Sequence, residues 1–236
     1  MFPSRTRDRF SRRAALQFLT VLAAAPQARA ATPNVDLALI LAIDCSFSVD
    51  AHEYSLQMQG LAQAFFSAEV SEAIAAGSLG RIAVSAFHWS DADNQQLIQP
   101  WMVIAGRPDA EEIGARLAIT PRQLAPGGTG IGAALLFGLN LLGSAPAAKR
   151  RVIDVSSDGR NNVGPPAPRV RDVLVAQGIA INGLVIRNEW PTLDVYFQDS
   201  VVGGEGHFVI SADDYDAYAE AILRKLVKEI TGPGVA

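Results

Sequence analysis

The chain has 236 residues, of which 49% are hydrophobic and 19% are charged, and its formal net charge is −4. This is an ordinary globular composition, long enough for one domain with a full core, and it excludes a disordered or low-complexity chain. The excess of acidic over basic residues argues against a nucleic-acid partner.

The first thirty residues differ in kind from the rest of the chain. Arginines precede an apolar stretch at residues 14–25, and Ala28-Arg29-Ala30 follows as a small-residue cleavage site. This pattern predicts a signal peptide over 1–30 and a single mature domain over 31–236, periplasmic or secreted. The alternative is an amphipathic first helix of the domain, because an apolar stretch of about a dozen residues is too short to span a membrane. Loss of residues 1–30, with six arginines and one aspartate, changes the net charge from −4 to −9.

The export route has two alternatives. Residues 11–16, with the sequence Ser-Arg-Arg-Ala-Ala-Leu, resemble a twin-arginine signal, which carries folded proteins across the membrane. Ala15 stands where such signals usually have phenylalanine, and Gln17 stands where they usually have lysine. The general secretory route therefore remains open as well.

Strand-like and helix-like segments alternate from residue 35 to residue 230. Apolar runs predict strands at 35–43, 81–89, 96–104, 151–156, 179–186 and 207–210. Helical spacing predicts helices at 49–76, 107–117, 131–142, 170–177 and 213–230. This alternation predicts an α/β fold: a doubly wound, mostly parallel six-stranded sheet with helices on both faces. The charged run at 224–229 is expected on the solvated face of the last helix, and no membrane span is expected.

Three segments bring oxygen-bearing side chains to one edge of the expected sheet. The first strand leads into Asp44, and Ser46 and Ser48 follow at intervals of two, which in an extended chain point the same way. Thr129 lies in the glycine-rich segment 127–130, and Asp158 follows the fourth strand. Ligands of such sheets bind at the carboxyl ends of the strands, and Mg²⁺ prefers oxygen ligands. The sequence therefore predicts a hard-cation site at this edge.

Together these residues resemble the metal-ion-dependent adhesion site (MIDAS) of von Willebrand factor type A (VWA) domains, and the chain looks closest to exported bacterial single-domain members. That site has Asp-x-Ser-x-Ser, then a Thr, then an Asp on separate loops. The resemblance implies direct ligation by Ser46 and Ser48, direct or water-mediated ligation by Thr129, and mostly water-mediated contacts from Asp44 and Asp158. The residue before the last aspartate is often threonine in the family and is a serine here, which keeps the hydroxyl.

The function implied by the resemblance is metal-dependent binding of a protein, in adhesion or assembly, without catalysis. Mg²⁺ (or Mn²⁺) would be held with an open coordination position that an Asp or Glu carboxylate of the partner fills. By the same analogy, the last helix and the residues before it, over 212–230, form the segment expected to tilt when metal and ligand bind.

Three other classes of protein are alternatives, and the sequence fits each of them less well. A metal-assisted hydrolase, such as a phosphatase, would use Asp44 as nucleophile or Ser46 activated by the metal. Aspartyl phosphatases need a second carboxylate two residues after the nucleophile, where this chain has Ser46. A serine hydrolase is disfavoured because no serine lies in a G-x-S-x-G turn, and a phosphate loop at 127–132 because no lysine completes it. A structural module whose site stays empty in the cell is the third alternative.

Other chemically active side chains have simpler interpretations. Cys45, the only cysteine, is expected to point into the core as a small buried side chain. His52 and His88 are expected to approach the rim of the site. Asn161 and Asn162 are expected to order the loop after the fourth strand through hydrogen bonds from side chain to backbone.

Overall fold

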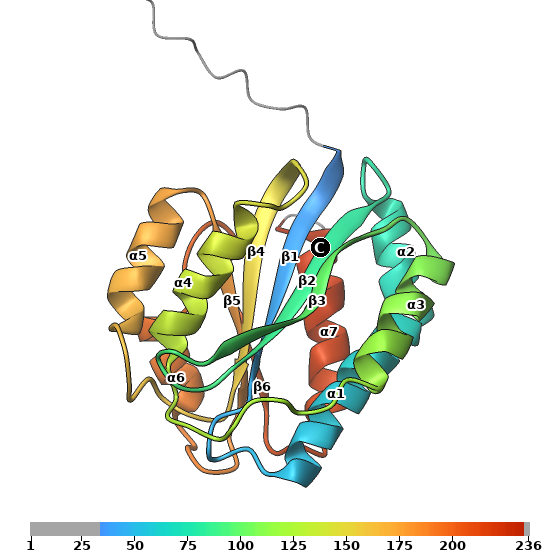
Figure 1. The fold of residues 1–236 in the computed structure, drawn as a ribbon. Coiled ribbons are helices and arrows are strands. Elements are labelled where there is room, and N and C mark those ends of the chain that lie inside the picture. The colour runs from blue at the N-terminus through green and yellow to red at the C-terminus, as the bar shows by residue number, and fades with distance from the viewer. Residues whose placement is uncertain (1–33, 234–236) are drawn as a thin grey trace, which may run out of the picture. The chain divides into compact units, whose positions relative to one another are not determined.

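A six-stranded sheet in the order β3-β2-β1-β4-β5-β6 forms the centre of the computed structural model (Figure 1). The structure describes residues 34–233, so the signal peptide predicted at 1–30 lies outside the described residues. Strand β3 is antiparallel to β2, and every other neighbouring pair is parallel. The predicted mostly parallel, six-stranded sheet is therefore confirmed. The strands are β1 (Val35–Asp44), β2 (Ile82–Trp89), β3 (Gln95–Ile104), β4 (Ala148–Ser157), β5 (Ala180–Ile186) and β6 (Val209–Ala212).

The strand order reverses between β1 and β4. The chain builds β2 and β3 on one side of β1, and then returns to place β4, β5 and β6 on the other side. In the β1–β4 register Ile43 lies opposite Ser156, so the next residues of both strands reach the same level of the sheet. Such a switch point leaves a crevice outside the carboxyl ends of the strands, which is where ligands of doubly wound sheets bind.

Helices cover both faces of the sheet (Figure 1). Side chains of β1 alternate between two hydrophobic cores: Leu37, Leu39 and Leu41 face one core, and Ala38 and Ile40 face the other. Burial on both faces explains why this strand is a continuous apolar run. The first core is closed by α1 (Ala51–Phe66), α2 (Ala68–Ala76), α3 (Arg107–Ala118) and α7 (Tyr218–Thr231), and the second by α4 (Ile131–Leu142), α5 (Ala167–Ala176) and α6 (Leu193–Ser200).

Three helices differ most from the sequence prediction, and α5 begins three residues earlier than the predicted 170–177. The helix predicted at 49–76 is two helices, because the Ser67 side chain accepts a hydrogen bond from Val70 N and starts α2 afresh. Helix α6 was not predicted. Helix α7 begins at Tyr218 instead of residue 213, because the preceding segment forms a turn in which Asp214 Oδ1 accepts a hydrogen bond from Ala217 N at 2.9 Å.

The prediction for the charged run at 224–229 is wrong for two of its residues. Lys225 and Glu229 are 0% and 1% exposed, and the Lys225 ammonium contacts the carboxylates of both Asp154 and Glu229. Asn182 Nδ2 also donates a hydrogen bond to Glu229 Oε1 at 3.2 Å. Asp154 and Asn182 lie inside the apolar runs of β4 and β5, and a buried polar group needs a partner. Polar residues within two apolar strands therefore indicated that another element supplies buried polar partners, and α7 is that element.

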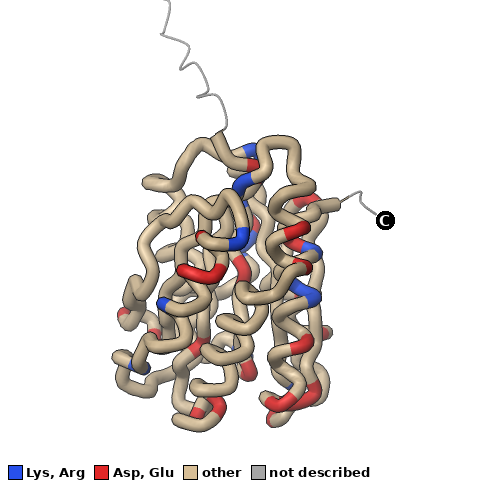
Figure 2. The backbone as a smooth tube through the Cα atoms, turned by 90° about the vertical axis from the view of Figure 1, so that its right-hand side faces the viewer, with Lys and Arg blue, Asp and Glu red and all other residues tan. Residues whose placement is uncertain are grey.

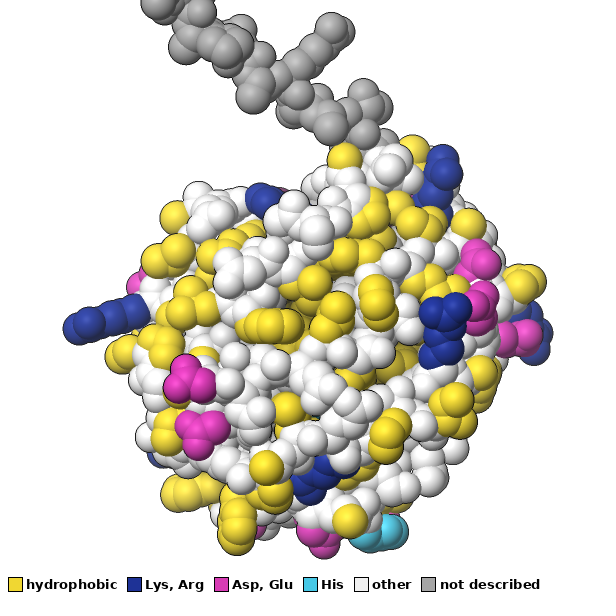
Figure 3. Space-filling view, viewed as in Figure 1, with side chains coloured by type: hydrophobic (Ala, Val, Ile, Leu, Met, Phe, Trp, Pro, Cys, Tyr) yellow, Lys and Arg dark blue, Asp and Glu magenta, His cyan; other side chains and the backbone are white. Residues whose placement is uncertain are grey.

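The surface has two distinct regions. Figure 2 shows Asp and Glu prevailing at the lower end of the domain, the end at which β1 and β4 stop in Figure 1. Figure 3 shows a band of hydrophobic side chains across the face on which α4 and β3 lie, where Leu136 and Leu97 are 39% and 40% exposed. Within residues 34–233, no helix combines the length and the apolar character needed to cross a membrane.

Candidate metal centre

Asp44, the last residue of β1, is fully buried at the carboxyl edge of the sheet. Its Oδ1 accepts a hydrogen bond from Ser46 N at 2.7 Å, and its Oδ2 accepts one from Ser157 Oγ. The strand order puts Ser157 at the end of the neighbouring β4. Both carboxylate oxygens are therefore oriented by neighbours from the two strands that meet at the switch point.

Ser46 and Ser48 lie in a turn that follows β1. Val49 N donates to Ser46 O at 3.2 Å, so the backbone forms a turn after β1. The predicted extended conformation of residues 44–48 is therefore wrong. The two hydroxyls nevertheless meet, with their Oγ atoms 3.2 Å apart. Ser48 Oγ also donates to Asp158 Oδ1 at 2.6 Å, which joins the loop after β1 to the loop after β4.

Thr129 belongs to a third loop, which leads into α4. Its backbone pairs with Asn162 in both directions: Thr129 N donates to Asn162 Oδ1 at 2.8 Å, and Asn162 N donates to Thr129 O at 3.0 Å. Asn161 Oδ1 accepts a hydrogen bond from Gly132 N at 2.9 Å, so the expected role of both asparagines is confirmed. The Thr129 side chain packs against Gly159, where a Cβ would lie only 3.2 Å from Thr129 Oγ1. These contacts hold the loop that carries Thr129 against the loop that follows β4.

All five predicted site residues therefore lie at one edge of the sheet. Ser48 and Thr129 line an open pocket of about 700 Å³, while Asp44 and Ser46 are buried beneath it. Asp158 is also buried, and its carboxylate contacts Ser48 from the side of β4.

The electrostatics of this edge favour a cation. Burial and, after it, the nearby Asp158 carboxylate together raise the pKa of Asp44 to about 7. Burial also raises the pKa of Asp158, although hydrogen bonds from Ser48 and Tyr215 oppose that shift. Two neighbouring buried carboxylates with a surplus of hydroxyl oxygens are the kind of donor set that suits a small hard dication. Among residues 34–233, no group of three His, Cys, Asp or Glu side chains is placed to hold a metal, so hydroxyls would have to complete the ligand set.

The structure adds residues that sequence reasoning missed. Arg122, from the segment between α3 and α4, donates hydrogen bonds to the carbonyl oxygens of Cys45, Ser46 and Val49 and fastens the turn after β1. Asp91 Oδ2 accepts a hydrogen bond from Gly128 N at 3.2 Å and supports the threonine loop. No local pattern marks either residue, because each contact joins segments far apart in the chain.

The histidine prediction is half wrong, whereas the cysteine prediction is confirmed. His88 is fully buried, with Nε2 3.3 Å from the Tyr54 hydroxyl, so it does not reach the rim. Burial and, after it, the Arg122 charge together lower the pKa of His88 to about 4, so the ring is neutral at pH 7. His52 is exposed in the first turn of α1. Cys45 is buried in the core, and burial raises the pKa of its thiol to about 12.

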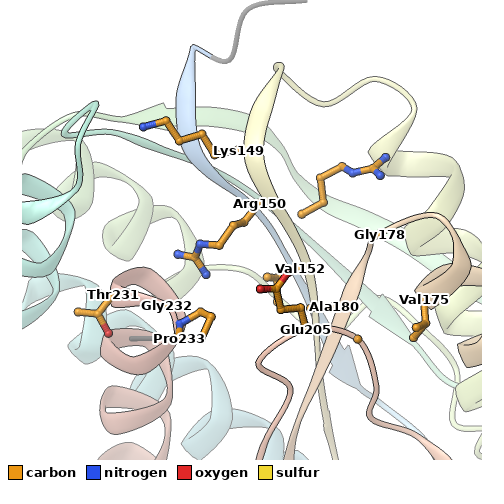
Figure 4. Close-up of a pocket in the computed structure, with 12 residues that line it drawn as sticks. Lys149, Arg150, Val152, Val175, Gly178, Ala180, Glu205, Thr231, Gly232 and Pro233 are labelled. Carbon is orange, nitrogen blue, oxygen red and sulfur yellow. The ribbon is translucent and has the colours of Figure 1, made fainter. Parts of the chain in front are cut away.

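A second cavity, of about 780 Å³, lies at the opposite end of β4 and is lined by basic residues (Figure 4). Arg150 Nη2 donates to Glu229 O and Ile230 O, and so caps the last turn of α7. Lys149 contacts Asp36, and Arg151 donates to Gln177 O beyond the end of α5. The three basic side chains of this cavity thus bind groups of the protein itself, namely carbonyl oxygens at helix ends and the Asp36 carboxylate.

The order of the strands and the helices on both faces of the sheet give this domain a VWA-like α/β fold. The chain matches the family DUF1194, described as a protein of unknown function, over residues 34–234, and it belongs to that family. No curated protein matches the sequence.

Solved structures share the fold at low sequence identity. Proximal thread matrix protein 1 (PTMP1) from the mussel byssus has a TM-score of 0.61 at 16% identity, covering 84% of this chain and 48% of its own. A von Willebrand factor type A protein from Catenulispora acidiphila has a TM-score of 0.56 at 18% identity, covering 83% and 43%. Manganese-loaded TRAP protein from Plasmodium vivax has a TM-score of 0.52 at 15% identity, covering 85% and 75%. The chain thus spans less than half of the mussel and Catenulispora chains.

Proposed function

We propose that this protein is an exported module that binds a partner protein through a divalent metal, in adhesion or assembly, and that it is not an enzyme. Mg²⁺ or Mn²⁺ would be held by the oxygen donors of three loops. The observation that carries the proposal is the convergence of those loops, above all the hydrogen bond of 2.6 Å from Ser48 Oγ to Asp158 Oδ1. The proposed ligands are Asp44, Ser46, Ser48, Thr129 and Asp158.

The proposed ligands would leave the bound metal ion electrophilic enough to attract a further carboxylate. Asp44 and Asp158 can balance a dication, while the three hydroxyls add coordination without adding charge. When bound, the metal would supply a positive centre with an open coordination position for a carboxylate oxygen. An Asp or Glu side chain of a partner protein is the proposed occupant of that position.

Relatives with the same fold support this choice of metal class. PTMP1 has a structure with a zinc occupied MIDAS motif, and the TRAP structure is manganese-loaded. Those statements concern the relatives themselves. For this chain, the oxygen-only donor set favours Mg²⁺ or Mn²⁺, because the harder cations suit hydroxyl and carboxylate ligands best.

Hydrolysis is less well supported than binding. The Ser46 hydroxyl pairs with Ser48, and in residues 34–233 no histidine forms a hydrogen bond with a serine hydroxyl. His88, held by Tyr54 beneath the surface, is not positioned to activate a water at the pocket. A general base at the site would therefore have to be one of the proposed metal-binding carboxylates.

Export is proposed from the sequence of residues 1–30, with cleavage after Ala30 and a periplasmic or secreted product. N-terminal sequencing of exported material tests the cleavage site, and a start at Ala31 is the expected result. Replacing Arg12 and Arg13 together by lysine separates the two routes, because the twin-arginine route depends on that pair. Unchanged export of this variant would assign the general secretory route.

Titration calorimetry of the metal-free protein with Mn²⁺ tests the metal site. The wild type is expected to bind one ion, and Asp158→Asn is expected to lose that binding because one of two charged ligands is gone. Asp172→Asn is the matched control, since its carboxylate is exposed on α5 and pairs with Arg171. Equal Mn²⁺ binding by wild type and Asp158→Asn would overturn the site.

Two further measurements test the partner class and the absence of catalysis. A capped pentapeptide with one glutamate among glycines is expected to bind only with Mn²⁺ present, and its glutamine counterpart is expected not to bind. Phosphate and carboxylate esters are expected to show no metal-dependent hydrolysis above background. A turnover that disappears in Asp44→Ala would favour the hydrolase instead.

A further inference from the structure

The pocket above the candidate metal centre has walls of a definite chemical character. It encloses about 700 Å³, which is within the range of sites that hold a small ligand or a short peptide segment. Four loops contribute to it, namely those after β1, before α4, after β4 and after β5. Its lining residues are Phe47, Ser48, Gly127, Gly128, Thr129, Gly159, Arg160, Asn162, Glu189 and Trp190.

Two glycines, Gly127 and Gly128, line the pocket at positions where a side chain would clash with neighbouring residues. A Cβ on Gly128 would lie 2.7 Å from Val163 Cγ1, and one on Gly127 would lie 2.9 Å from Asp91 Cβ. Backbone at these positions therefore approaches its neighbours more closely than any residue with a side chain allows. The pocket stays open above the hydroxyls of Ser48 and Thr129.

One wall of the pocket is the Phe47 ring, between the two serines of the metal loop. Its backbone N–H donates to Gly127 O at 2.9 Å, so the backbone of this residue is fixed. The ring itself is 84% exposed, although Phe65, Phe87 and Phe197 are all fully buried. An aromatic ring held in solvent beside a pocket is a ready contact for a partner, because aromatic residues dominate the energetics of interfaces.

Trp190, in the loop after β5, also lines the pocket, and its side chain is 45% exposed. The Arg160 guanidinium lies 5.1 Å from the Trp190 ring and 5.4 Å from the Tyr196 ring. Arg160 Nη2 also donates to Thr192 Oγ1 at 3.0 Å. Cation–π contact and this hydrogen bond hold the Trp190 ring before any ligand arrives, which lowers the entropy cost of binding.

The charges of the residues that line the pocket cancel, although acidic residues prevail at this end of the domain as a whole. Arg160 and Glu189 are the charged residues among those that line it, and they have opposite signs. Inside the pocket a ligand would therefore meet the charge of the metal, no net charge from the lining side chains, and the rings of Phe47 and Trp190. Residues that flank the bound carboxylate gain from contact with the rings and find no excess charge to pair with.

We infer that the partner presents its acidic residue on a short exposed segment with apolar, preferentially aromatic, neighbours, which pack against Phe47 and Trp190. This inference rests on the proposed metal-dependent binding of a carboxylate and adds the chemical class of the residues beside it. Phe47 and Trp190 thereby set specificity, whereas the oxygen donors set the need for metal.

Calorimetry with two capped peptides in saturating Mn²⁺ tests the inference. One peptide has a glutamate between two phenylalanines, and the other has the same glutamate between two alanines. The phenylalanine peptide is expected to bind the wild type about tenfold more tightly, because burial of one aromatic side chain is worth at least that factor. In Phe47→Ser combined with Trp190→Ser, the ratio of the two affinities is expected to fall to about one.

Controls separate this inference from the metal site. Val173→Ser removes an apolar side chain that is 51% exposed on α5, away from the pocket, and is expected to keep the tenfold ratio. The Mn²⁺ affinity of each variant is measured in the same series. Equal affinity of both peptides for a wild type that binds Mn²⁺ would overturn the inference alone. A wild type that binds no Mn²⁺ would overturn the proposed function and the inference with it.

Discussion

The Tyr215 hydroxyl donates a hydrogen bond of 3.0 Å to Asp158 Oδ2, while Ser48 Oγ donates to the other oxygen of the same carboxylate at 2.6 Å. Tyr215 lies in the turn between β6 and α7, so the segment before the last helix reaches directly into the candidate metal centre. Burial and the negative charge of Asp158 both raise the pKa of Tyr215, which keeps the phenol protonated as a donor. A residue that orients a ligand in this way normally affects metal affinity strongly.

Tyr215→Phe is expected to weaken Mn²⁺ binding by about tenfold, because Asp158 loses the donor that fixes one of its oxygens. Tyr54→Phe is the matched control, since the Tyr54 hydroxyl donates to Thr120 O at 2.8 Å and makes no contact with a proposed ligand. Each variant is expected to lose about 1 kcal/mol of stability with its hydrogen bond. Calorimetry with Mn²⁺ distinguishes them. Equal affinities in the two variants would show that Tyr215 has only a structural role.

Arg122 holds the turn that carries both serines of the site. Its Nη2 donates to Cys45 O at 2.9 Å and to Ser46 O at 3.1 Å, and its Nη1 donates to Val49 O. A lysine has a single compact ammonium that cannot reproduce this fork of donors. Arg122→Lys would leave carbonyl oxygens without donors at a buried turn.

We therefore expect Arg122→Lys to lose about 2 kcal/mol of unfolding free energy and to bind Mn²⁺ more weakly than the wild type. Arg116→Lys is the control, because Arg116 forms only an exposed i,i+4 pair with Glu112, worth at most about 0.5 kcal/mol. Urea unfolding and Mn²⁺ titration measure the two effects. If both lysine variants behave alike, the three carbonyl contacts of Arg122 contribute nothing.

The sequence predicted much of the fold because the strands and helices carry strong local patterns. The β1 run is apolar on both faces, and the helix at 131–142 was predicted with the bounds that α4 has in the structure. The meeting of the proposed ligands Asp44 and Asp158 was also predicted, because parallel strands bring their carboxyl ends to one edge. Their role as metal ligands stays a prediction. Local sequence patterns were therefore enough to predict the strands, the helices and the edge of the sheet at which the candidate site lies.

Contacts between distant segments could not be read in the same way. Arg122 contacts Cys45 across 77 positions and Tyr215 contacts Asp158 across 57, and neither stands in a recognisable motif. The charged run on α7 was misjudged for a related reason. Local spacing describes one helix face, whereas the burial of Lys225 is decided by Asp154 on the distant β4.

Gly132, in the first turn of α4, allows this helix to approach the loop before α5. A Cβ at Gly132 would lie 2.1 Å from Pro165 O, a backbone atom that cannot move aside cheaply. Gly132→Ala is therefore expected to cost about 3 kcal/mol and to separate Thr129 from the loop that carries Asp158. Gly106→Ala is the control, because the nearest atom to its added Cβ is 3.9 Å away, and a loss within about 1 kcal/mol is expected. Urea unfolding compares them, and equal losses would contradict the steric argument.

The buried charges beneath α7 give the domain a dependence on pH that is independent of the metal site. Asp154 and Glu229 share one ammonium, that of Lys225, and Asn182 and Arg150 lie on the neighbouring strands. Burial and, after it, the Asp154 charge together raise the pKa of Glu229 from 4.5 to about 7, although Lys225 opposes the shift. Two carboxylates and one ammonium are neutral overall only when one carboxyl keeps its proton.

The sign of the effect follows from proton counts. Between pH 4.5 and pH 7 the folded state holds a proton on Glu229 that the unfolded state has lost, so the stability that this proton provides is complete below pH 4.5 and is lost as pH rises through 7. Glu229→Gln has no proton to lose at this position. Its stability relative to the wild type is therefore expected to rise by about 1–3 kcal/mol between about pH 5 and about pH 8.

Urea unfolding of both proteins across that pH range measures the difference. Glu220→Gln is the matched control, because Glu220 lies on the same helix but its side chain is 79% exposed and pairs with Arg224 at the surface. Its stability curve is expected to run parallel to that of the wild type. If the Glu229→Gln curve also runs parallel to the wild type, Glu229 titrates alike in the folded and unfolded chains, and the buried cluster is not the source of the pH dependence.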